Sequence, residues 1–351
     1  MIPPLFSGLS IPCHKSPVIN NPIEHLNEDA TKAFAQSQAL TSNKSPQDFY
    51  NELAQIGTSP QELVSFLEPS GITDEYDNIP LYEKISDFSN KKIHILFANA
   101  MDEDPYISSG ARQLAEFGEE ILYAFAVIRK ACGVQKSKIL LCDRFLLENE
   151  IKQKHYGIFV QRMYGKYPLM SSVERKYGKK GYGTIGVGAL REFAWYVKNR
   201  QNIRRTVITV SGENIINPKN ILVNVGTPVA EILNFTGIKD EQNIIFAKGV
   251  FNTEIIKDTY SYKVKADTRA VTALNEQSIP QKEPSPCCGC GNCVSVCHKK
   301  LMPYYIVKAY ERADSLAVKS FYPEECDGCG ACTINCPAMI NVAEIISNAK
   351  V

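Results

Sequence analysis

Two stretches of the chain share one spacing of cysteines: CCGCGNCVSVC at residues 287–297 and CDGCGACTINC at residues 326–336. From Cys287 and from Cys326, each reads Cys-x2-Cys-x2-Cys-x3-Cys, and Pro337 follows the second. Three thiolates at this spacing bind one iron–sulfur cubane, while the fourth, three residues farther on, points away and ligates the other cluster. The pattern therefore predicts two [4Fe–4S] clusters.

The crossed ligation typical of two-cluster ferredoxins predicts which cysteines share a cluster. We expect one cluster to be held by Cys287, Cys290, Cys293 and Cys336, and the other by Cys326, Cys329, Cys332 and Cys297. Glycines between the ligands favour tight turns whose N–H groups face the cluster sulfides. These glycines are Gly289, Gly291, Gly328 and Gly330.

Zinc is the alternative metal, because paired Cys-x2-Cys motifs also build tetrahedral zinc ribbons. A zinc site leaves no role for a third and a fourth cysteine in both copies. A disulfide framework is a further alternative. Iron–sulfur chemistry explains all eight positions, so we favour it over both.

The remaining cysteines do not extend the pattern. Cys288 adjoins a ligand, and we expect a spectator thiol rather than a fifth ligand, with a redox role left open. Cys13, Cys132 and Cys142 are isolated in sequence and are expected to be reduced. Thiols and oxygen-labile clusters suit a reducing compartment, and the first residues lack the pattern of a secretory signal. We therefore expect a cytoplasmic protein.

The composition is that of a globular protein with enough chain for two or three compact units. The chain has 351 residues, of which 44% are hydrophobic and 22% charged. A net charge of +1 gives no reason to expect nucleic acid or an anionic membrane surface as a partner. Because no apolar run approaches roughly 20 residues, we expect no direct membrane insertion and only peripheral association through partner proteins.

Changes in composition divide the chain into four expected regions. Residues 7–46 are polar and aperiodic, which is typical of an arm that runs over another surface. Prolines and polar residues at 281–286 indicate a hinge before the cysteine motifs. The regions are an extended arm at 1–58, an α/β domain at 59–204, a small β-rich module at 205–280 and a cluster domain at 281–351.

The α/β assignment comes from a strand, a helix and a strand in succession. A helix is predicted after Ser59 and Pro60. The apolar run 93–98 predicts a buried strand, with His94 packed in the core. Periodic apolar residues predict one long helix from Ser108 or Ser109 to Gly133, and a second strand follows at 138–141. This order predicts a parallel sheet.

Shorter elements are predicted beyond this unit. Helical patterns occupy residues 190–198 and 229–233, while strands are expected at 206–210, 220–223 and 243–246. Residues 301–320, between the cysteine motifs, have helical periodicity. The last region is therefore expected to be an α-helical two-cluster ferredoxin domain.

Four segments resemble the C subunit of the Rnf electron-transport complex and its relatives, which include the proline-reductase-associated electron-transfer protein. They are FSGLSIP at 6–12 with His14 and Lys15, ANAMDEDPY at 98–106, TVITVSG at 206–212 with VGTP at 225–228, and LMP at 301–303 after Cys297. The resemblance implies a central α/β domain like the complex I flavin subunit and a small β-grasp module of the soluble-ligand-binding (SLBB) type. It also implies electron transfer between a nicotinamide or flavin and iron–sulfur partners.

The chain departs from that family where the family binds flavin. Its G-x-G-G-A-G-F-P loop, which holds phosphates on backbone N–H groups, has no counterpart in this sequence. The N-A-D-E-x-E-P flavin contact keeps Asn99 and Asp104 but has Met101 in place of its first acid, and a later glycine–glutamate–glutamate contact finds no match near 164–168. Asn99 and Asp104 are thus the remnant of a flavin site, and we expect binding of FMN and NADH to be weakened or lost.

One other glycine motif, GYGTIG at 181–186, fits G-x-G-x-x-G before a helix. A dinucleotide site also needs a preceding strand and an acid about twenty residues on, and neither is evident. The alternative is a flexible loop whose basic neighbours form a solvated face that docks an acidic electron-transfer partner. These neighbours are Lys176, Lys179 and Lys180.

The predicted function is therefore that of an iron–sulfur electron-transfer subunit within a larger oxidoreductase of an anaerobic type. Its expected partners are other redox subunits or an electron-carrier protein. One alternative is a flavin-dependent NADH dehydrogenase subunit, with FMN and two [4Fe–4S] clusters, whose phosphate loop has diverged. Another is a scaffold whose clusters are only structural. Flavin absorption in the purified protein would separate the first alternative from the leading hypothesis.

Overall fold

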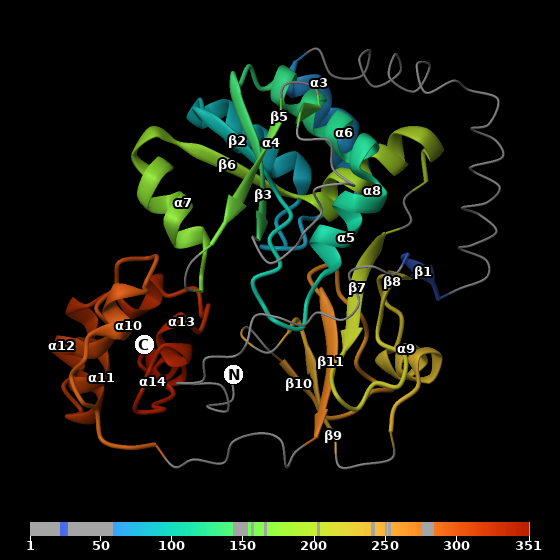
Figure 1. Ribbon diagram of the computed structural model, residues 1–351. Helices are drawn as coiled ribbons and strands as arrows, with labels where there is room; N and C mark the ends of the chain where they lie inside the picture. Colours follow the sequence, from blue (N-terminus) through green and yellow to red (C-terminus); the bar gives the residue numbers. More distant parts are fainter. Residues whose placement is uncertain are drawn as a thin grey trace.

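The computed structural model describes most of the chain from residue 59 onward and a short segment before it (Figure 1). The described residues are 22–26, 59–142, 154–155, 158–164, 167–201, 204–239, 243–249, 251, 254–275 and 284–350. Cys13 and most of the predicted arm at 1–58 lie outside them, as does the first half of the predicted hinge at 281–286.

A five-stranded sheet forms the centre of the first unit, in the order β4-β5-β3-β2-β6. Its strands are β2 (Ile95–Asn99), β3 (Lys136–Cys142), β4 (Lys154–His155), β5 (Ile158–Met163) and β6 (Tyr182–Gly186). The pairs β2–β3, β2–β6 and β3–β5 are parallel, and β4 is an antiparallel edge strand. All five residues of β2 are buried, as its apolar run predicts. The predicted parallel sheet is confirmed.

Within the described residues, six α-helices pack around this sheet and bury its core. They are α3 (Pro60–Leu67), α4 (Leu81–Lys91), α5 (Ser109–Glu116), α6 (Gly118–Ala131), α7 (Met170–Tyr177) and α8 (Val187–Asn199). Helix α3 begins with a capping box, in which Ser59 and Glu62 each accept a hydrogen bond from the other's backbone N–H. Phe97, Phe125 and Phe193 are fully buried between the helices and the sheet. The predicted helices beginning at Pro60 and spanning 190–198 are confirmed.

The predictions for one helix and for His94 are wrong. The single helix expected to run to Gly133 is two helices, because Phe117 leaves the helical region at φ −113° and ψ 23°, where α5 ends and α6 begins. Gly118, a poor helix former, follows the break. His94 is exposed rather than packed in the core, and its Nε2 lies 3.3 Å from Nζ of Lys136. Side chains alternate at the start of the strand, so His94 points away from the core that holds Ile93 and Ile95.

A second sheet of six strands follows, in the order β1-β8-β7-β11-β9-β10. Its strands are β1 (Glu24–His25), β7 (Arg205–Ser211), β8 (Lys219–Asn224), β9 (Asn243–Ala247), β10 (Glu254–Ile256) and β11 (Ala270–Asn275). Strands β7 and β8 form an antiparallel pair, and β11 lies parallel to β7. Helix α9 (Val229–Thr236) buries Val229 and Ile232 in the same core as Ile208 and Val210. The three predicted strands and the predicted helix are confirmed.

Strand β1 belongs to the predicted arm but lies on the chain's own second sheet, beside β8 (Figure 1). The Ile23 N–H donates to Glu116 at the end of α5 (2.9 Å), and Lys219 pairs with Glu24 (2.8 Å). This described part of the arm therefore contacts both sheet units of the same chain.

Short helices make up the carboxyl-terminal unit, drawn in orange to red in Figure 1. They are α10 (Asn292–Ser295), α11 (Pro303–Glu311), α12 (Ser315–Ser320), α13 (Ala331–Ile334) and α14 (Val342–Asn348). Leu301, Ile306, Val318 and Ile346 form its apolar core. The predicted helices between the two cysteine motifs are confirmed, with a break where Ala313 has a φ of 55°. No helix in the described ranges has the length and apolar character needed to cross a membrane.

Candidate iron–sulfur site

The two cysteine motifs fold into the same backbone shape. Four glycines between the ligands have left-handed φ angles, which are accessible to glycine at no steric cost. They are Gly289 (68°), Gly291 (72°), Gly328 (74°) and Gly330 (75°). The tight turns expected at these positions are therefore present in both motifs.

A short helix follows each pair of glycines and carries the third cysteine, Cys293 on α10 and Cys332 on α13. The fourth cysteine then donates its N–H to the last turn, from Cys297 to the Val294 carbonyl (3.3 Å) and from Cys336 to the Thr333 carbonyl (3.1 Å). In both motifs the backbone next turns at a residue with a φ of 58°. These residues are Lys300 and Met339. The repeat in sequence is thus a repeat in three dimensions.

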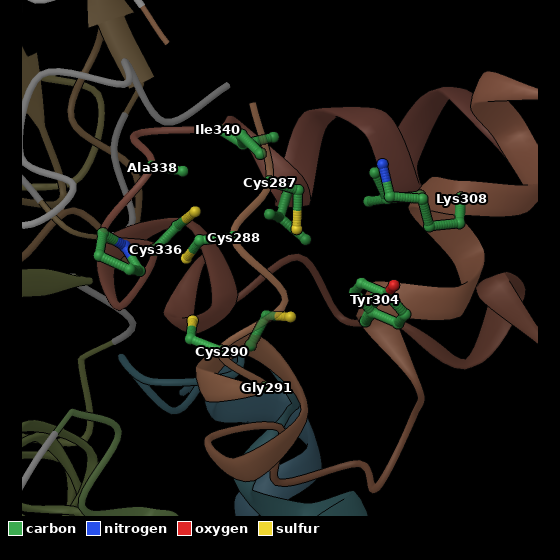
Figure 2. Close-up of a pocket in the computed structure, with 13 residues that line it drawn as sticks. Cys287, Cys288, Cys290, Gly291, Tyr304, Lys308, Cys336, Ala338 and Ile340 are labelled. Carbon is green, nitrogen blue, oxygen red and sulfur yellow. The ribbon is translucent and has the colours of Figure 1, made fainter. Parts of the chain in front are cut away.

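Four thiols expected to share a cluster line one cavity (Figure 2). Cys287, Cys290 and Cys293 come from the first motif, whereas Cys336 comes from the second. Cys288 lines the same cavity and is exposed. Apolar side chains complete the wall, and these include Val307, Ala338, Ile340 and Val342. The fold therefore brings together the first of the two crossed sets.

The other four cysteines also lie close to one another. Burial, followed by the nearby Cys326 and then Cys297, raises the pKa of the Cys332 thiol to about 12. Burial raises the pKa of Cys329 as well, and Cys332 and Cys326 add to the shift. The fourth cysteine of the first motif, Cys297, packs in the same core cluster as Cys326 and Cys332 of the second.

The donor atoms of both groups fit iron–sulfur clusters. Buried thiols keep their protons until a metal supplies positive charge, so cluster binding would release protons. Backbone N–H groups of the short helices act in the opposite direction to burial. Those of Val294 and Thr333 lower the pKa of Cys293 and Cys332. Amide donors that stabilise a thiolate also hydrogen-bond to the sulfur atoms of a bound cluster and tune the reduction potential of the cluster.

A polar group beside Cys329 was not predicted from the sequence. His298 Nε2 lies 2.6 Å from Asp327 Oδ2, and its Nδ1 lies 3.7 Å from the Cys329 Sγ. The three ligand atoms lie within 4.8 Å of one another. His298 and Asp327 each directly follow a cysteine of the crossed set, His298 after Cys297 and Asp327 after Cys326. The crossing itself could therefore have indicated that they meet.

The cluster unit contacts the first unit at the carboxyl end of β5. Tyr167, four residues after β5, donates its hydroxyl to the Cys329 carbonyl (2.9 Å). Its ring packs on Phe251 from the second unit, at a centroid distance of 4.9 Å. The Leu169 N–H donates to Oε2 of Glu103 (2.6 Å), a residue that follows β2. The second cysteine motif is therefore held against the carboxyl edge of the parallel sheet.

The two residues expected as remnants of a flavin site do not share partners. Asn99, buried at the end of β2, accepts a hydrogen bond from the Met101 N–H (3.0 Å). Asp104 accepts from the N–H groups of Tyr106 (3.0 Å) and Phe251 (2.8 Å). The hydrogen bonds resolved at both side chains thus go to the chain's own backbone. A flavin role for them stays a prediction.

The glycine motif at 181–186 is neither a loop nor a dinucleotide turn. Strand β6 begins at Tyr182 and pairs with β2 throughout, from Ile95 opposite Tyr182 to Asn99 opposite Gly186. Gly183 is buried, and a side chain there would lie within 3 Å of Phe88 and Ile93. The nearby lysines remain exposed, as expected. Lys176 lies on α7, and Lys179 and Lys180 lie on a short 3-10 helix at Gly178–Lys180.

The comparison with protein families identifies the cysteine-bearing unit. A model described as a 4Fe–4S dicluster domain matches residues 268–340, which contain both motifs. The match supports the iron–sulfur chemistry predicted for the last region and does not extend to the α/β unit.

Curated relatives cover more of the chain. The C subunit of the proton-translocating ferredoxin:NAD(+) oxidoreductase complex of Clostridium ljungdahlii is 22% identical over 77% of this chain. The C subunit of the ion-translocating oxidoreductase complex of Buchnera aphidicola is 25% identical over 83%. That of the Na(+)-translocating complex of Acetobacterium woodii is 23% identical over 66%. The chain spans only 64%, 66% and 56% of these relatives' own lengths.

The fold is similar to that of a chain in the crystal structure of an NAD+-reducing [NiFe]-hydrogenase in the H2-reduced state. The TM-score is 0.58 at 10% sequence identity, over 85% of this chain and 63% of the hydrogenase chain. The mixed α/β organisation is therefore shared with a redox protein. The curated homologues and the dicluster match together show that this chain is similar to the C subunits of ion-translocating oxidoreductase complexes of the Rnf type.

Proposed function

We propose that the chain relays electrons through two [4Fe–4S] clusters as an iron–sulfur subunit of a larger oxidoreductase. The observation that carries the proposal is the cavity in which Cys336 of the second motif joins three cysteines of the first. A zinc ribbon has no use for such an exchange of a fourth thiol. The dicluster match and the homologues, which are named as subunits of oxidoreductase complexes, support the same function.

Each residue set has a defined part in this proposal. Bound clusters would accept and donate single electrons. The ligands would be Cys287, Cys290, Cys293 and Cys336 for one cluster, and Cys326, Cys329, Cys332 and Cys297 for the other. Apolar residues such as Val307 and Ile340 form part of the wall around the first set. Amides such as the Val294 N–H stabilise thiolate charge.

We also propose the finer division of the fold. Residues 59–204 would form the α/β domain, 205–280 a β-grasp module of the SLBB type, and 281–351 the cluster domain. Support for the β-grasp assignment is the β7–β8 hairpin, the packed helix α9 and the return of β11 parallel to β7. Most of the arm at 1–58 lies outside the described residues.

The partners proposed for the chain are other redox subunits or an electron-carrier protein, because its relatives are named as subunits of multi-subunit complexes. Cys287 and Cys290 are exposed, whereas Cys332 is buried. The first set of thiols therefore lies nearer to solvent than the second. Electron transfer to an external carrier is favoured at the exposed set.

Anaerobic purification with iron and sulfide analysis tests the proposal. We expect about eight irons and eight acid-labile sulfides per chain, and two interacting paramagnetic centres after dithionite reduction. Cys132→Ser, outside the motifs, is the matched control and should retain all of the iron. Stoichiometric zinc, or clusters that cannot be reduced reversibly, would contradict electron transfer.

A second candidate is a flavin-dependent NADH dehydrogenase subunit with FMN and two clusters. The observation that favours it is the likeness of the fold to a chain of an NAD+-reducing hydrogenase. Under this alternative, one FMN per chain would be extracted from the same preparation. The isolated chain would also catalyse NADH oxidation with an artificial electron acceptor. We expect neither from the isolated chain.

A further inference from the structure

The parallel sheet has a topological switch point between β2 and β6. From β2 the chain moves outward to β3 and then β5, and it returns to the other side of β2 to form β6. In open α/β sheets, ligands bind at the carboxyl ends of the strands where the strand order reverses in this way. The corresponding crevice lies after Asn99 of β2 and Gly186 of β6, at the start of α8.

Two carboxylates of the chain itself occupy this crevice. Both oxygens of Glu75 accept hydrogen bonds at the start of α8, from the N–H groups of Gly188 (2.6 Å) and Ala189 (3.0 Å). Asp74 Oδ2 accepts from the Gly186 N–H (2.7 Å). Three backbone donors at the amino end of a 13-residue helix are the kind of site that holds a phosphate. Here they hold Asp74 and Glu75, which we call the acidic pair.

The glycines of this turn match the acidic pair closely. A Cβ at Gly186 would overlap the Glu75 carboxyl group, and one at Gly188 would lie 2.9 Å from its carboxyl carbon. No real Cβ approaches another atom so closely, so the carboxylate reaches the backbone only because these residues lack side chains. The sequence GVG at 186–188 therefore accommodates the carboxylate of Glu75.

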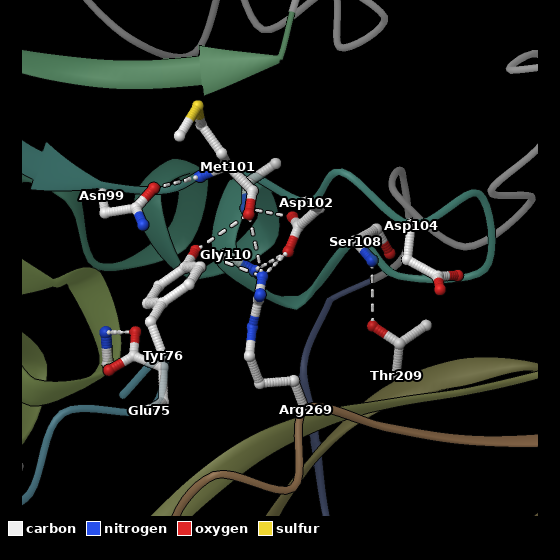
Figure 3. A network of polar contacts seen from close by, with 12 residues as sticks. Glu75, Tyr76, Asn99, Met101, Asp102, Asp104, Ser108, Gly110, Thr209 and Arg269 are labelled. Atoms are coloured by element: carbon white, nitrogen blue, oxygen red, sulfur yellow. Dashed lines mark hydrogen bonds and ion pairs between the residues drawn. The ribbon is translucent and has the colours of Figure 1, made fainter. Parts of the chain in front are cut away.

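The acidic pair is buried and balanced by cations. Asp74 is fully buried and Glu75 is 7% exposed. Lys84, also buried, pairs with Asp74 at 2.6 Å. Arg269, from the second sheet unit, hydrogen-bonds to the Tyr76 hydroxyl (3.1 Å) and the Met101 carbonyl (3.0 Å) beside Glu75 (Figure 3). Burying a carboxylate is costly unless hydrogen-bond donors and a cation compensate for the lost water, and both are present here.

We propose that the acidic pair fills the nucleotide-phosphate position of the switch-point crevice, so that the crevice binds a carboxylate of this chain instead of a flavin or nicotinamide phosphate. A phosphate placed on the same N–H groups would require Glu75 to leave. It would also meet the negative charge of Asp74. This inference concerns the α/β unit and does not rest on the clusters of the proposed function.

Chemical rescue tests the inference. Glu75→Ala leaves the Gly188 and Ala189 N–H groups without their acceptor, and a pocket that Glu75, Gly188 and Arg204 line gives small ions access to them. We expect formate, compared with chloride at equal ionic strength, to raise the melting temperature of Glu75→Ala by several degrees. The native protein and the control Glu83→Ala, which removes an exposed carboxylate, should respond equally to the two salts.

Titration of the native holoprotein with FMN and with orthophosphate is the second measurement. It decides the matter even where Glu75→Ala does not fold. We expect no saturable binding of either. One FMN bound per chain at micromolar concentration, or the same response to formate in Glu75→Ala and Glu83→Ala, would overturn the inference. Iron content measured on the same samples distinguishes a failure of this inference from a failure of the proposed function.

Discussion

Cys336 shows how one residue joins two distant parts of the sequence. It closes the second motif in the chain but lines the cavity of the first. The spacing of the cysteines predicts this because the fourth thiol of such a motif points away from the other three. His298 and Asp327 were not predicted, since their contact depends on the crossing rather than on any local pattern. The ligand cysteines were thus predictable from the sequence, whereas the contact between His298 and Asp327 was not predicted.

Replacing Cys336 tests the proposed ligand sets. In Cys336→Ala we expect the cluster of Cys287, Cys290 and Cys293 to be lost, because it lacks a fourth thiolate, while about four irons remain in the other. Iron analysis and the paramagnetic spectrum of the reduced protein would detect the change. Cys297→Ala should remove the other cluster. If Cys336→Ala instead removed the cluster of the second motif, ligation would not be crossed.

Glu75 should make stability depend on pH. Burial, with the charge of Asp74 next, raises the pKa of its carboxyl from 4.5 to about 7, and Arg269 opposes the shift. Between these values the folded chain keeps a proton that the unfolded chain has released. The contribution of Glu75 to the free energy of unfolding is therefore full below about pH 4.5 and is lost as the pH rises to about 7. At about 1.4 kcal/mol per pH unit, the contribution that is lost is on the order of 3 kcal/mol.

Thermal unfolding of the native protein and of Glu75→Gln across this pH range measures the effect. The amide does not titrate, so the difference in melting temperature between the two proteins should change between about pH 5 and pH 7.5 and level off above that. A constant difference across the range would show that Glu75 keeps an ordinary pKa.

At the scale of elements, continuous apolar runs predicted the strands well. Strands β2 and β7 are buried throughout, and β3 is buried over its apolar end at 139–142. The break at Phe117 was missed because the apolar periodicity continues through it. Strand β6 was missed because its glycines are typical of loops, although Gly183 is small in order to pack against Phe88. A single sequence does not distinguish a glycine required for close packing from a glycine required for a turn.

The turns of the cysteine motifs give a prediction about glycine. Gly291 has a φ of 72° and open space around its missing Cβ, whereas Gly118 begins α6 with equally open space. Gly291→Ala should therefore destabilise the protein by about 1–2 kcal/mol through backbone strain alone. Gly118→Ala should be neutral or slightly stabilising, because alanine favours a helix.

Thermal denaturation and the rate of cluster loss on warming compare the two variants. We expect Gly291→Ala to melt several degrees lower and to lose iron faster than the native protein. Equal behaviour of both alanine variants would show that the left-handed turn is not needed around the ligands.

At the scale of the whole molecule, polar contacts between residues far apart in the sequence help to join the three units. Arg269 of the second sheet unit bonds to Asp102 of the first, and Tyr167 bonds to the Cys329 carbonyl of the cluster unit (Figure 3 shows Arg269). Sequence patterns indicated the units but not these contacts, because the partners lie more than 150 residues apart. The Tyr167 contact brings the second cysteine motif to the carboxyl edge of the parallel sheet.

The exposed lysines near β6 give a prediction about partners. Lys176, Lys179 and Lys180 are exposed, so they remain available to attract an acidic carrier. Reversing all three to glutamate should slow cluster reduction by an acidic carrier protein severalfold at low salt. The effect should fade as the Debye length falls from about 30 Å at 0.01 M to about 3 Å at 1 M salt. Stopped-flow absorbance would follow the reduction.

A control variant with the same change of net charge separates docking from a general effect. Lys130, Lys257 and Lys263 are also exposed and lie elsewhere in the chain. Their reversal should leave the rate closer to that of the native protein. Identical rates for both triple variants at every salt concentration would place the docking face elsewhere, at the exposed cysteines of the cluster unit.

The position of Cys336 in the cavity of the first motif has a consequence for biosynthesis. With the proposed ligand sets, the ribosome makes three ligands of the first cluster early, but it makes the fourth, Cys336, only as the last residue of the second motif. Cys332 completes the other set just four residues before Cys336. Neither cluster can therefore be inserted with full ligation before Cys332 has been translated. Iron delivery to the two sites becomes a single, late event in the life of the nascent chain.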